Sequence, residues 1–135
     1  MIGLDAFMPG TFPGTARAPI GPAVVALGGG HGLSATLSAL RLMSDRLCAV
    51  VTVADDGGSS GRLRDELGVL PPGDLRMALT ALCDDSDWGR TWSALLQHRF
   101  TSKGELDRHA VGNLLIVALW AVSYTHLTLP TILRV

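Results

Sequence analysis

The sequence predicts an α/β protein in which a Rossmann-like parallel sheet is flanked by helices. Two short runs, at residues 22–27 and 47–54, are apolar throughout, which is typical of strands buried on both faces of a parallel sheet. Between them, leucines recur at helical spacing over residues 33–43, so strand, helix and strand form one crossover unit. Both strands end in glycine-rich segments, and ligands of open α/β sheets bind at this edge.

Length and composition limit the chain to one domain and exclude several kinds of partner. The 135 residues are 47% apolar and 17% charged, which excludes a disordered, solvating protein. A net charge of −1 leaves no excess of positive charge for binding nucleic acid. The longest apolar run, residues 114–122, is too short to span a bilayer, which takes about 20 residues. Cys48 and Cys83 lack metal-ligand spacing and indicate a reducing compartment, so we expect a cytoplasmic protein.

The remaining pattern predicts four further elements, all of them helical. A short helix is expected at residues 62–67, after a polar glycine loop. Asp74 follows a Pro-Pro-Gly break and is expected to cap the next helix. Ser86 or Asp87 is expected to cap another, with Trp88, Trp92, Leu95 and Leu96 aligned on one face. The helix expected over residues 109–122 is apolar nearly all round, which predicts burial in a larger core.

The chain divides into three segments of different character. Residues 1–21 are rich in proline and glycine and are expected to form a flexible leader. Residues 22–122 are expected to be the N-terminal part of a Rossmann-like nucleotide-binding domain, because two strands are too few to cover the helices. Residues 123–135 resemble a translated adaptor sequence and are interpreted as a non-native tail. A genuine short strand over residues 125–129 is the alternative.

The first glycine-rich segment is expected to bind an anion. It consists of Gly28, Gly29, Gly30, His31 and Gly32, between the first strand and the first helix. Backbone N–H groups at a helix N-terminus attract a phosphate, and glycine lets it approach the main chain. The segment matches neither the dinucleotide fingerprint GxGxxG nor the P-loop, which needs a lysine followed by serine or threonine. A tight turn without a ligand is the alternative interpretation.

The second segment is expected to lie beside the first, at the same edge of the sheet. Asp55 is expected to accept a hydrogen bond from a ribose hydroxyl, or Asp55 and Asp56 together to hold Mg²⁺ near phosphates. The amides of Gly57 and Gly58 can donate to phosphate oxygens, as can the side chains of Ser59, Ser60, Arg62 and Arg64. A solvated turn is the alternative, because Asp-Asp-Gly-Gly is strong turn chemistry.

Asn113 is the other candidate residue, and it lies on an otherwise apolar helix. Burying its amide without a partner is unfavourable, so Asn113 either satisfies an internal group or reaches the ligand crevice. His109 adds a second polar group to this helix. The spacing assigns no Ser-His-Asp or Cys-His set, so no catalytic residue is predicted.

Four segments together resemble the N-terminal part of the YvcK family. They are VVALGGGHGLSATLSALR, VVTVADDGGSSGRLRDELGVLPPGDLRMALTAL, LLQHRF and HAVGNLLI, and the match covers about residues 22–122. Members of this family are known as gluconeogenesis factors or UDP-N-acetylglucosamine-binding proteins. They belong with the 2-phospho-L-lactate transferases, the CofD family, to one superfamily of Rossmann-like fold.

The resemblance implies a UDP-sugar or dinucleotide ligand, held by residues 28–32 with the Asp55 segment beside it. It implies a cytoplasmic regulator of cell shape and central carbon metabolism, and leaves open whether the full-length protein is a homo-oligomer. The transferase relatives use a divalent metal, with an aspartate at the position of Asp55 or Asp56, so an Mg²⁺-dependent transferase is the alternative function. The Gly-Gly-Ser-Ser that follows these aspartates matches the gluconeogenesis factors rather than the transferases, which favours a binding protein over an enzyme.

Overall fold

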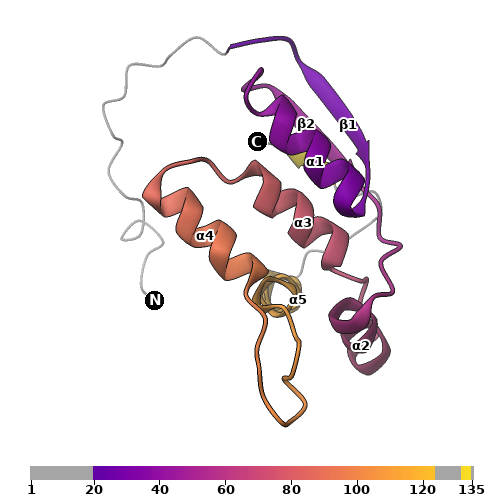
Figure 1. The fold of residues 1–135 in the computed structure, drawn as a ribbon. Helices are drawn as coiled ribbons and strands as arrows, with labels where there is room; N and C mark the ends of the chain where they lie inside the picture. Colours follow the sequence, from indigo (N-terminus) through magenta and orange to yellow (C-terminus); the bar gives the residue numbers. More distant parts are fainter. Residues whose placement is uncertain (1–19, 124–131, 135) are drawn as a thin grey trace, which may run out of the picture.

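The fold is α/β, as the sequence predicts, and is built on one strand–helix–strand unit. A computed structural model describes residues 20–123 and 132–134. Strands β1 (Val24–Gly28) and β2 (Leu47–Val51) pair in parallel, and α1 (Gly30–Leu40) connects them (Figure 1). In the register of this pair, Val24 lies opposite Leu47 and Gly28 opposite Val51. Both strands therefore end at the same edge of the sheet, where the two glycine-rich segments begin.

A third strand completes the described sheet. β3 (Ile132–Arg134) pairs antiparallel with β2, which gives the strand order β1-β2-β3. The sequence analysis predicted no strand here, because it assigned residues 123–135 to a tail. The alternative strand at residues 125–129 and nearly all of the leader at residues 1–21 lie outside the described residues. Whether the tail is native stays a prediction.

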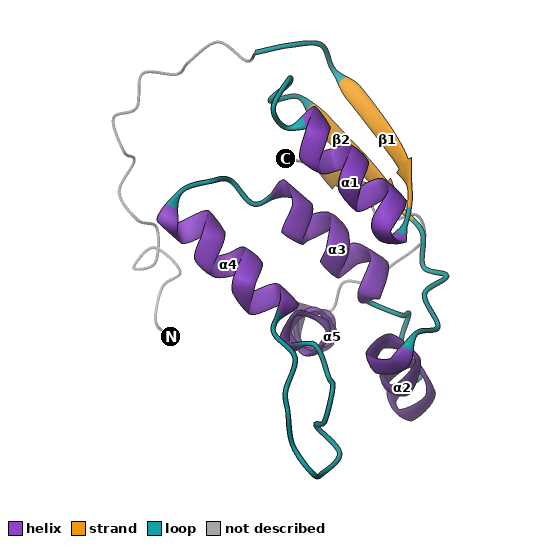
Figure 2. Cartoon of the chain, in the orientation of Figure 1, coloured by secondary structure: helices purple, strands orange, loops and turns teal. Residues whose placement is uncertain are grey.

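Four helices follow β2, and α3 is central among them. They are α2 (Gly58–Leu67), α3 (Gly73–Leu82), α4 (Asp87–Gln97) and α5 (Val111–Ser123). Helix α3 contacts α1, β2, α4 and α5. Figure 2 shows α1 and α3 side by side next to the sheet, with α4 on the other side of α3. The apolar core lies between α1, α3 and the sheet, around Leu37, Ala49 and Ala78.

Apolar residues of β1 and of α5 are exposed in this chain. The sheet was expected to be buried on both faces, but Val25 and Leu27 of β1 are 60% and 74% exposed. Helix α5 was expected to be buried in a core larger than this chain supplies, and in this chain Leu119 and Val122 are 61% and 70% exposed. The reason is the same in both cases: the described helices cover one side of these elements and nothing described covers the other.

Both glycine-rich segments are helical where loops were expected. Helix α1 begins at Gly30 and not at residue 33, and α2 begins at Gly58 and not at residue 62. His31, Ser59 and Ser60 therefore lie in first helical turns. The turn into α1 depends on glycine, because Gly28 and Gly30 have φ angles of +144° and +57°, which L side chains rarely adopt.

The predicted caps are confirmed at one helix and corrected at another. The side chain of Ser86 caps α4 and accepts a hydrogen bond from the backbone N–H of Gly89 at 3.0 Å. Asp74 does not cap α3: the N-cap is Pro72, and Asp74 lies inside the first turn. On α4, Trp88 is exposed and stacks edge-to-face with Trp92, whereas Leu96 is buried. The four aligned residues therefore do not form one buried face.

Candidate functional site

A cavity of about 480 Å³ opens where the N-terminal turns of α1, α2, α3 and α5 converge. Most of the predicted site residues line it: Gly30, His31, Asp55, Ser59, Ser60, Arg62 and Asn113. Gly28, Gly29, Gly32 and Asp56 do not line it. Gly57 and Gly58, whose amides were expected to donate to phosphate, also line it. The remaining walls come from residues that the sequence analysis did not select as site residues, namely Asp74, Arg76, Met77, Gln97, Arg99 and Arg108.

The charges around this cavity favour an anionic ligand. Four arginines line it, Arg62, Arg76, Arg99 and Arg108, against two carboxylates, Asp55 and Asp74. Each of the four helices also directs the positive end of its dipole toward the cavity. Arginine forks and helix N-termini are the groups with which proteins bind phosphate.

The first glycine segment is tied to α3 by Asp74. Its Oδ1 accepts a hydrogen bond from the backbone N–H of Gly30 at 3.0 Å, and its Oδ2 accepts one from Thr52 Oγ1 at 2.5 Å. A side chain on Gly29 would collide with Thr52 and Asp74, so glycine is required there by close packing. The N–H of Gly30, expected to face a phosphate, is thus already bonded. Asp74 was missed as a site residue because its pattern matched a helix cap.

Only one of the two adjacent aspartates, Asp55 and Asp56, lines the cavity. Asp55 lines the cavity, and its Oδ1 accepts a hydrogen bond from the backbone N–H of Gly57 at 2.9 Å. Asp56 is exposed and lies outside the cavity wall. Over residues 20–123, no three aspartate, glutamate, histidine or cysteine side chains group as metal ligands would. The geometry therefore does not fit an Mg²⁺ ion held by both aspartates.

Asn113 is the centre of a buried polar network behind the cavity wall. It is 1% exposed, and its Nδ2 donates to Ser59 Oγ at 3.0 Å and to Ser60 Oγ at 3.3 Å. Its Oδ1 accepts from Nε of Arg76 at 3.0 Å. The sequence left two roles open for Asn113, and the structure gives it both: it satisfies internal groups and also lines the cavity.

The same network determines the protonation of His109. Ser59 Oγ accepts from Nδ2 of Asn113 and, at 3.2 Å, from the backbone N–H of Ala110. With both lone pairs used, the hydroxyl proton of Ser59 is donated to Nδ1 of His109, 2.9 Å away. Burial, and secondarily the charge of Arg62, lowers the pKa of His109 and keeps the ring neutral. Ser59, expected to donate to a phosphate, donates to this histidine instead.

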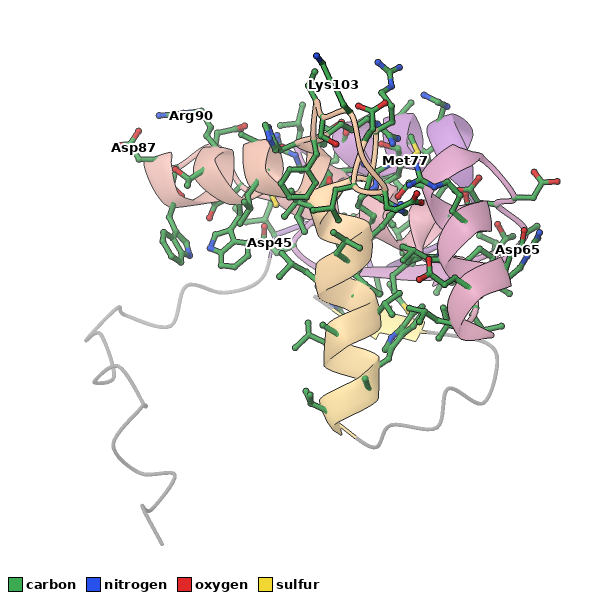
Figure 3. All side chains as sticks on the ribbon, turned by 90° about the horizontal axis from the view of Figure 1, so that it is seen from below. Asp45, Asp65, Met77, Asp87, Arg90 and Lys103 are labelled. Carbon is green, nitrogen blue, oxygen red and sulfur yellow. The ribbon has the colours of Figure 1, made fainter. Side chains whose placement is uncertain are left out.

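Arg62 holds the loop of residues 98–110 against α2. Its Nη1 donates to the carbonyl of Asp107 at 2.7 Å, and its Nη2 donates to the carbonyl of Glu105. Arg64, also expected to bind phosphate, pairs with Asp65 on the outer side of α2. Figure 3 shows Asp65 well away from Met77 of the cavity wall, and Lys103 at the tip of the loop.

The loop of residues 98–110 brings two more arginines to the cavity. Arg99 and Ala110 form an antiparallel bridge, and Nη1 of Arg99 donates to the carbonyl of Arg108 at 2.9 Å. Arg108 has a φ of +65°, a conformation uncommon for a residue with a side chain. Non-glycine residues held in such conformations cluster at functional sites. No local sequence pattern predicts that these two arginines reach the cavity, because the folding of the loop brings them there.

Arg76 is the most buried of the four arginines, at 7% exposure. Within residues 20–123, no carboxylate lies within ion-pairing distance of it. Burial lowers the pKa of Arg76, the charge of Arg99 lowers it further, and Asp55 acts in the opposite direction. The sequence analysis missed Arg76, although its place two residues after Asp74 in the Pro-Pro-Gly-Asp-Leu-Arg segment was an available signal.

The fold and the site define a Rossmann-like α/β protein with an arginine-lined cavity at the carboxyl ends of its parallel strands. The sequence model of the family described as "2-phospho-L-lactate transferase CofD" matches residues 24–129. The chain therefore belongs to the CofD family, which confirms the resemblance stated from the sequence.

Curated relatives share much of the described sequence. A "Putative gluconeogenesis factor" of Mycobacterium leprae is 63% identical over 98 residues, which are 73% of this chain and 27% of the relative. A "Gluconeogenesis factor" of Listeria innocua is 42% identical over 118 residues, 84% of this chain and 36% of the relative. The chain thus spans about a third or less of these proteins.

A solved structure shares the fold. The crystal structure of protein BH3568 from Bacillus halodurans, also described as a member of the upf0052 family, matches with a TM-score of 0.65 and 43% identity. The match covers 76% of this chain and 32% of that protein. In the part of the chain that the structure describes, no helix has the length and apolar character needed to cross a membrane.

Proposed function

We propose that this chain is the nucleotide-binding part of a gluconeogenesis factor, which binds a sugar nucleotide of the UDP-N-acetylglucosamine type in the arginine-lined cavity. The names of its relatives support a role in gluconeogenesis. The proposal extends further, to a cytoplasmic regulator of cell shape and central carbon metabolism. Its main support is the convergence of four helix N-termini and four arginines on one cavity.

The residues that line the cavity suit different parts of such a ligand. The arginines and helix N-termini suit the phosphates, and the carboxylate of Asp55 suits a ribose or sugar hydroxyl. His31 of α1 is exposed at the rim and can donate to the base or a phosphate. A volume of about 480 Å³ falls within the range of small-molecule sites, roughly 300–1,000 Å³.

A transferase resembling the 2-phospho-L-lactate transferases is the second candidate, favoured by the description of the family that matches. Such an enzyme needs Mg²⁺ to offset charge on the transferred group. The outward position of Asp56 argues against a two-aspartate metal site. The two functions therefore differ in whether binding of the ligand needs a divalent metal.

Calorimetric titration of the chain with UDP-N-acetylglucosamine, with and without EDTA, tests the proposal. We expect binding that is unchanged by EDTA, with UDP binding more tightly than free N-acetylglucosamine because the phosphates carry the charge. Absence of binding would overturn the proposed function. Binding that disappears in EDTA and returns with Mg²⁺ would favour the transferase.

A further inference from the structure

None of the four cavity arginines has a carboxylate partner among residues 20–123. Arg62 donates from both terminal nitrogens to carbonyls of the 98–110 loop, and Arg99 donates to the carbonyl of Arg108 from Nη1 alone. Arg76 and Arg99 are the two whose charges act on each other. Arg76 is buried at 7% exposure, yet among the described residues its guanidinium donates only from Nε. Its two terminal nitrogens are therefore available on the cavity wall.

Asn113 fixes the direction of these nitrogens. A guanidinium group is planar, so a hydrogen bond from Nε to Asn113 Oδ1 at 3.0 Å fixes the plane in which Nη1 and Nη2 lie. Asn113 is itself held by Ser59 and Ser60 on α2. The aliphatic part of Arg76 also packs against Gly112, where a Cβ would come within 2.9 Å of its Cγ and Cδ. Arg76 is thus a positioned donor and not a mobile surface charge.

The two charges oppose each other when the cavity holds no anion. Arg99 acts on Arg76 as a like charge, and Asp55 is the one acidic side chain that acts on it favourably. The N-terminal turns of α2, α3 and α5 add positive potential to the same wall. A multiply charged anion between the two guanidinium groups would relieve this repulsion and accept from both forks.

We propose that Arg76 and Arg99 form a diphosphate subsite, with Asn113 as the residue that positions Arg76, and that this subsite makes the cavity select diphosphates over monophosphates. The inference rests on the proposed function, since it assigns the diphosphate of the sugar nucleotide to these two side chains. The subsite can also be tested without the sugar nucleotide, because inorganic pyrophosphate carries the same diphosphate group.

The test uses pyrophosphate, orthophosphate, UDP-N-acetylglucosamine and UMP as separate ligands in calorimetric titrations. We expect the wild-type chain to bind pyrophosphate more tightly than orthophosphate, and the sugar nucleotide more tightly than UMP. Arg76→Gln and Arg99→Gln should each lower the affinity for pyrophosphate by about 10- to 100-fold, which is the loss of a charge-assisted hydrogen bond. Arg76→Lys should restore part of it, because it keeps the charge but not the fork.

Arg64→Gln is the matched control, because it removes one positive charge from α2 outside the cavity. We expect it to leave both affinities unchanged. Melting of the ligand-free variants separates binding from structure. Arg76→Gln removes the donor to the buried Oδ1 of Asn113 and should melt below the wild type, whereas Arg99→Gln, at an exposed residue, removes a like charge and should melt close to the wild-type temperature. A purely structural arginine would also lower the melting temperature but leave pyrophosphate binding intact.

The outcomes distinguish this inference from the proposed function. Wild-type binding of pyrophosphate that Arg76→Gln abolishes, without any binding of UDP-N-acetylglucosamine, would keep the subsite and overturn the sugar-nucleotide proposal. Binding of the sugar nucleotide that neither Arg76→Gln nor Arg99→Gln weakens would overturn the subsite and keep the proposed function. Equal affinity of the wild type for UMP and the sugar nucleotide would also overturn the diphosphate subsite.

Discussion

Asp74 Oδ1 accepts a hydrogen bond from the backbone N–H of Gly30 at 3.0 Å, across 44 residues of chain. This bond places a carboxylate between the N-termini of α1 and α3, where both helix dipoles favour negative charge. Its other oxygen accepts from Thr52 just after β2. One buried side chain therefore fixes the mutual position of the three segments that begin the cavity.

Replacing Asp74 should destabilise the fold. In Asp74→Ala the N–H of Gly30 and the hydroxyl of Thr52 lose their acceptor, so we expect the free energy of unfolding to fall by about 2–3 kcal/mol. Asp74→Asn keeps one acceptor oxygen and should lose less. Urea unfolding measures both, with the exposed Asp65→Asn as the control. Equal stability of Asp74→Ala and Asp65→Asn would contradict the bridging role.

Gly30→Val should weaken nucleotide binding and also lower stability. The φ of +57° at Gly30 is strained for a β-branched residue by about 1–2 kcal/mol. The new side chain would also stand on the cavity wall. Gly32→Val is the matched control, because a Cβ there meets nothing within 4 Å. Titration with UDP-N-acetylglucosamine and urea unfolding should show a loss of affinity and stability in Gly30→Val and neither loss in Gly32→Val. Unchanged affinity in a folded Gly30→Val chain would show that Gly30 is not part of the binding site.

Asp55 and Asp56 should behave differently although they are adjacent. Asp55 lines the cavity and Asp56 does not, so Asp55→Asn should lower the affinity for UDP-N-acetylglucosamine roughly 10-fold, as expected for one charged hydrogen bond. Asp56→Asn should leave it unchanged, with or without EDTA. If both substitutions and EDTA abolish binding, the metal-dependent transferase becomes the better interpretation.

Stability should fall as the pH is lowered below about 6.5, the ordinary pKa of histidine. The folded-state pKa of His109 is depressed by burial, so the unfolded chain binds a proton at a pH where the folded chain stays neutral. Protonating Nδ1 would also break the bond from Ser59. Urea unfolding at pH 7.5 and pH 5.0 measures the effect. His109→Gln should reduce this pH dependence, whereas His31→Gln, on the exposed rim, should retain it.

The 135-residue chain should bind hydrophobic dyes in its native state. Leu119 and Val122 of α5 and Leu27 of β1 are largely exposed, and exposed apolar surface binds such dyes. Leu119→Glu with Val122→Glu should reduce the dye fluorescence without loss of helicity. A cooperative thermal transition with no dye binding before it would contradict the prediction.

The local pattern predicted the elements because their causes are local. The apolar runs of β1 and β2 and the spacing of Leu33 and Leu37 depend only on neighbouring residues, and all are confirmed. Ser86 was found as a cap for the same reason. The starts of α1 and α2 were placed too late, because glycine and serine suit a first helical turn and a loop equally well.

Some features of the site likewise follow from the sequence alone, and others only from the tertiary structure. The sequence alone determined that two glycine segments follow two parallel strands, because strand direction fixes the edge at which both end. Only the tertiary structure decided that Asp74 joins them, that Ser59 bonds His109, and that Arg76, Arg99 and Arg108 face one cavity. These contacts join residues as much as 54 positions apart, and no local pattern encodes which distant groups the packing of α3, α5 and the 98–110 loop brings within hydrogen-bond distance.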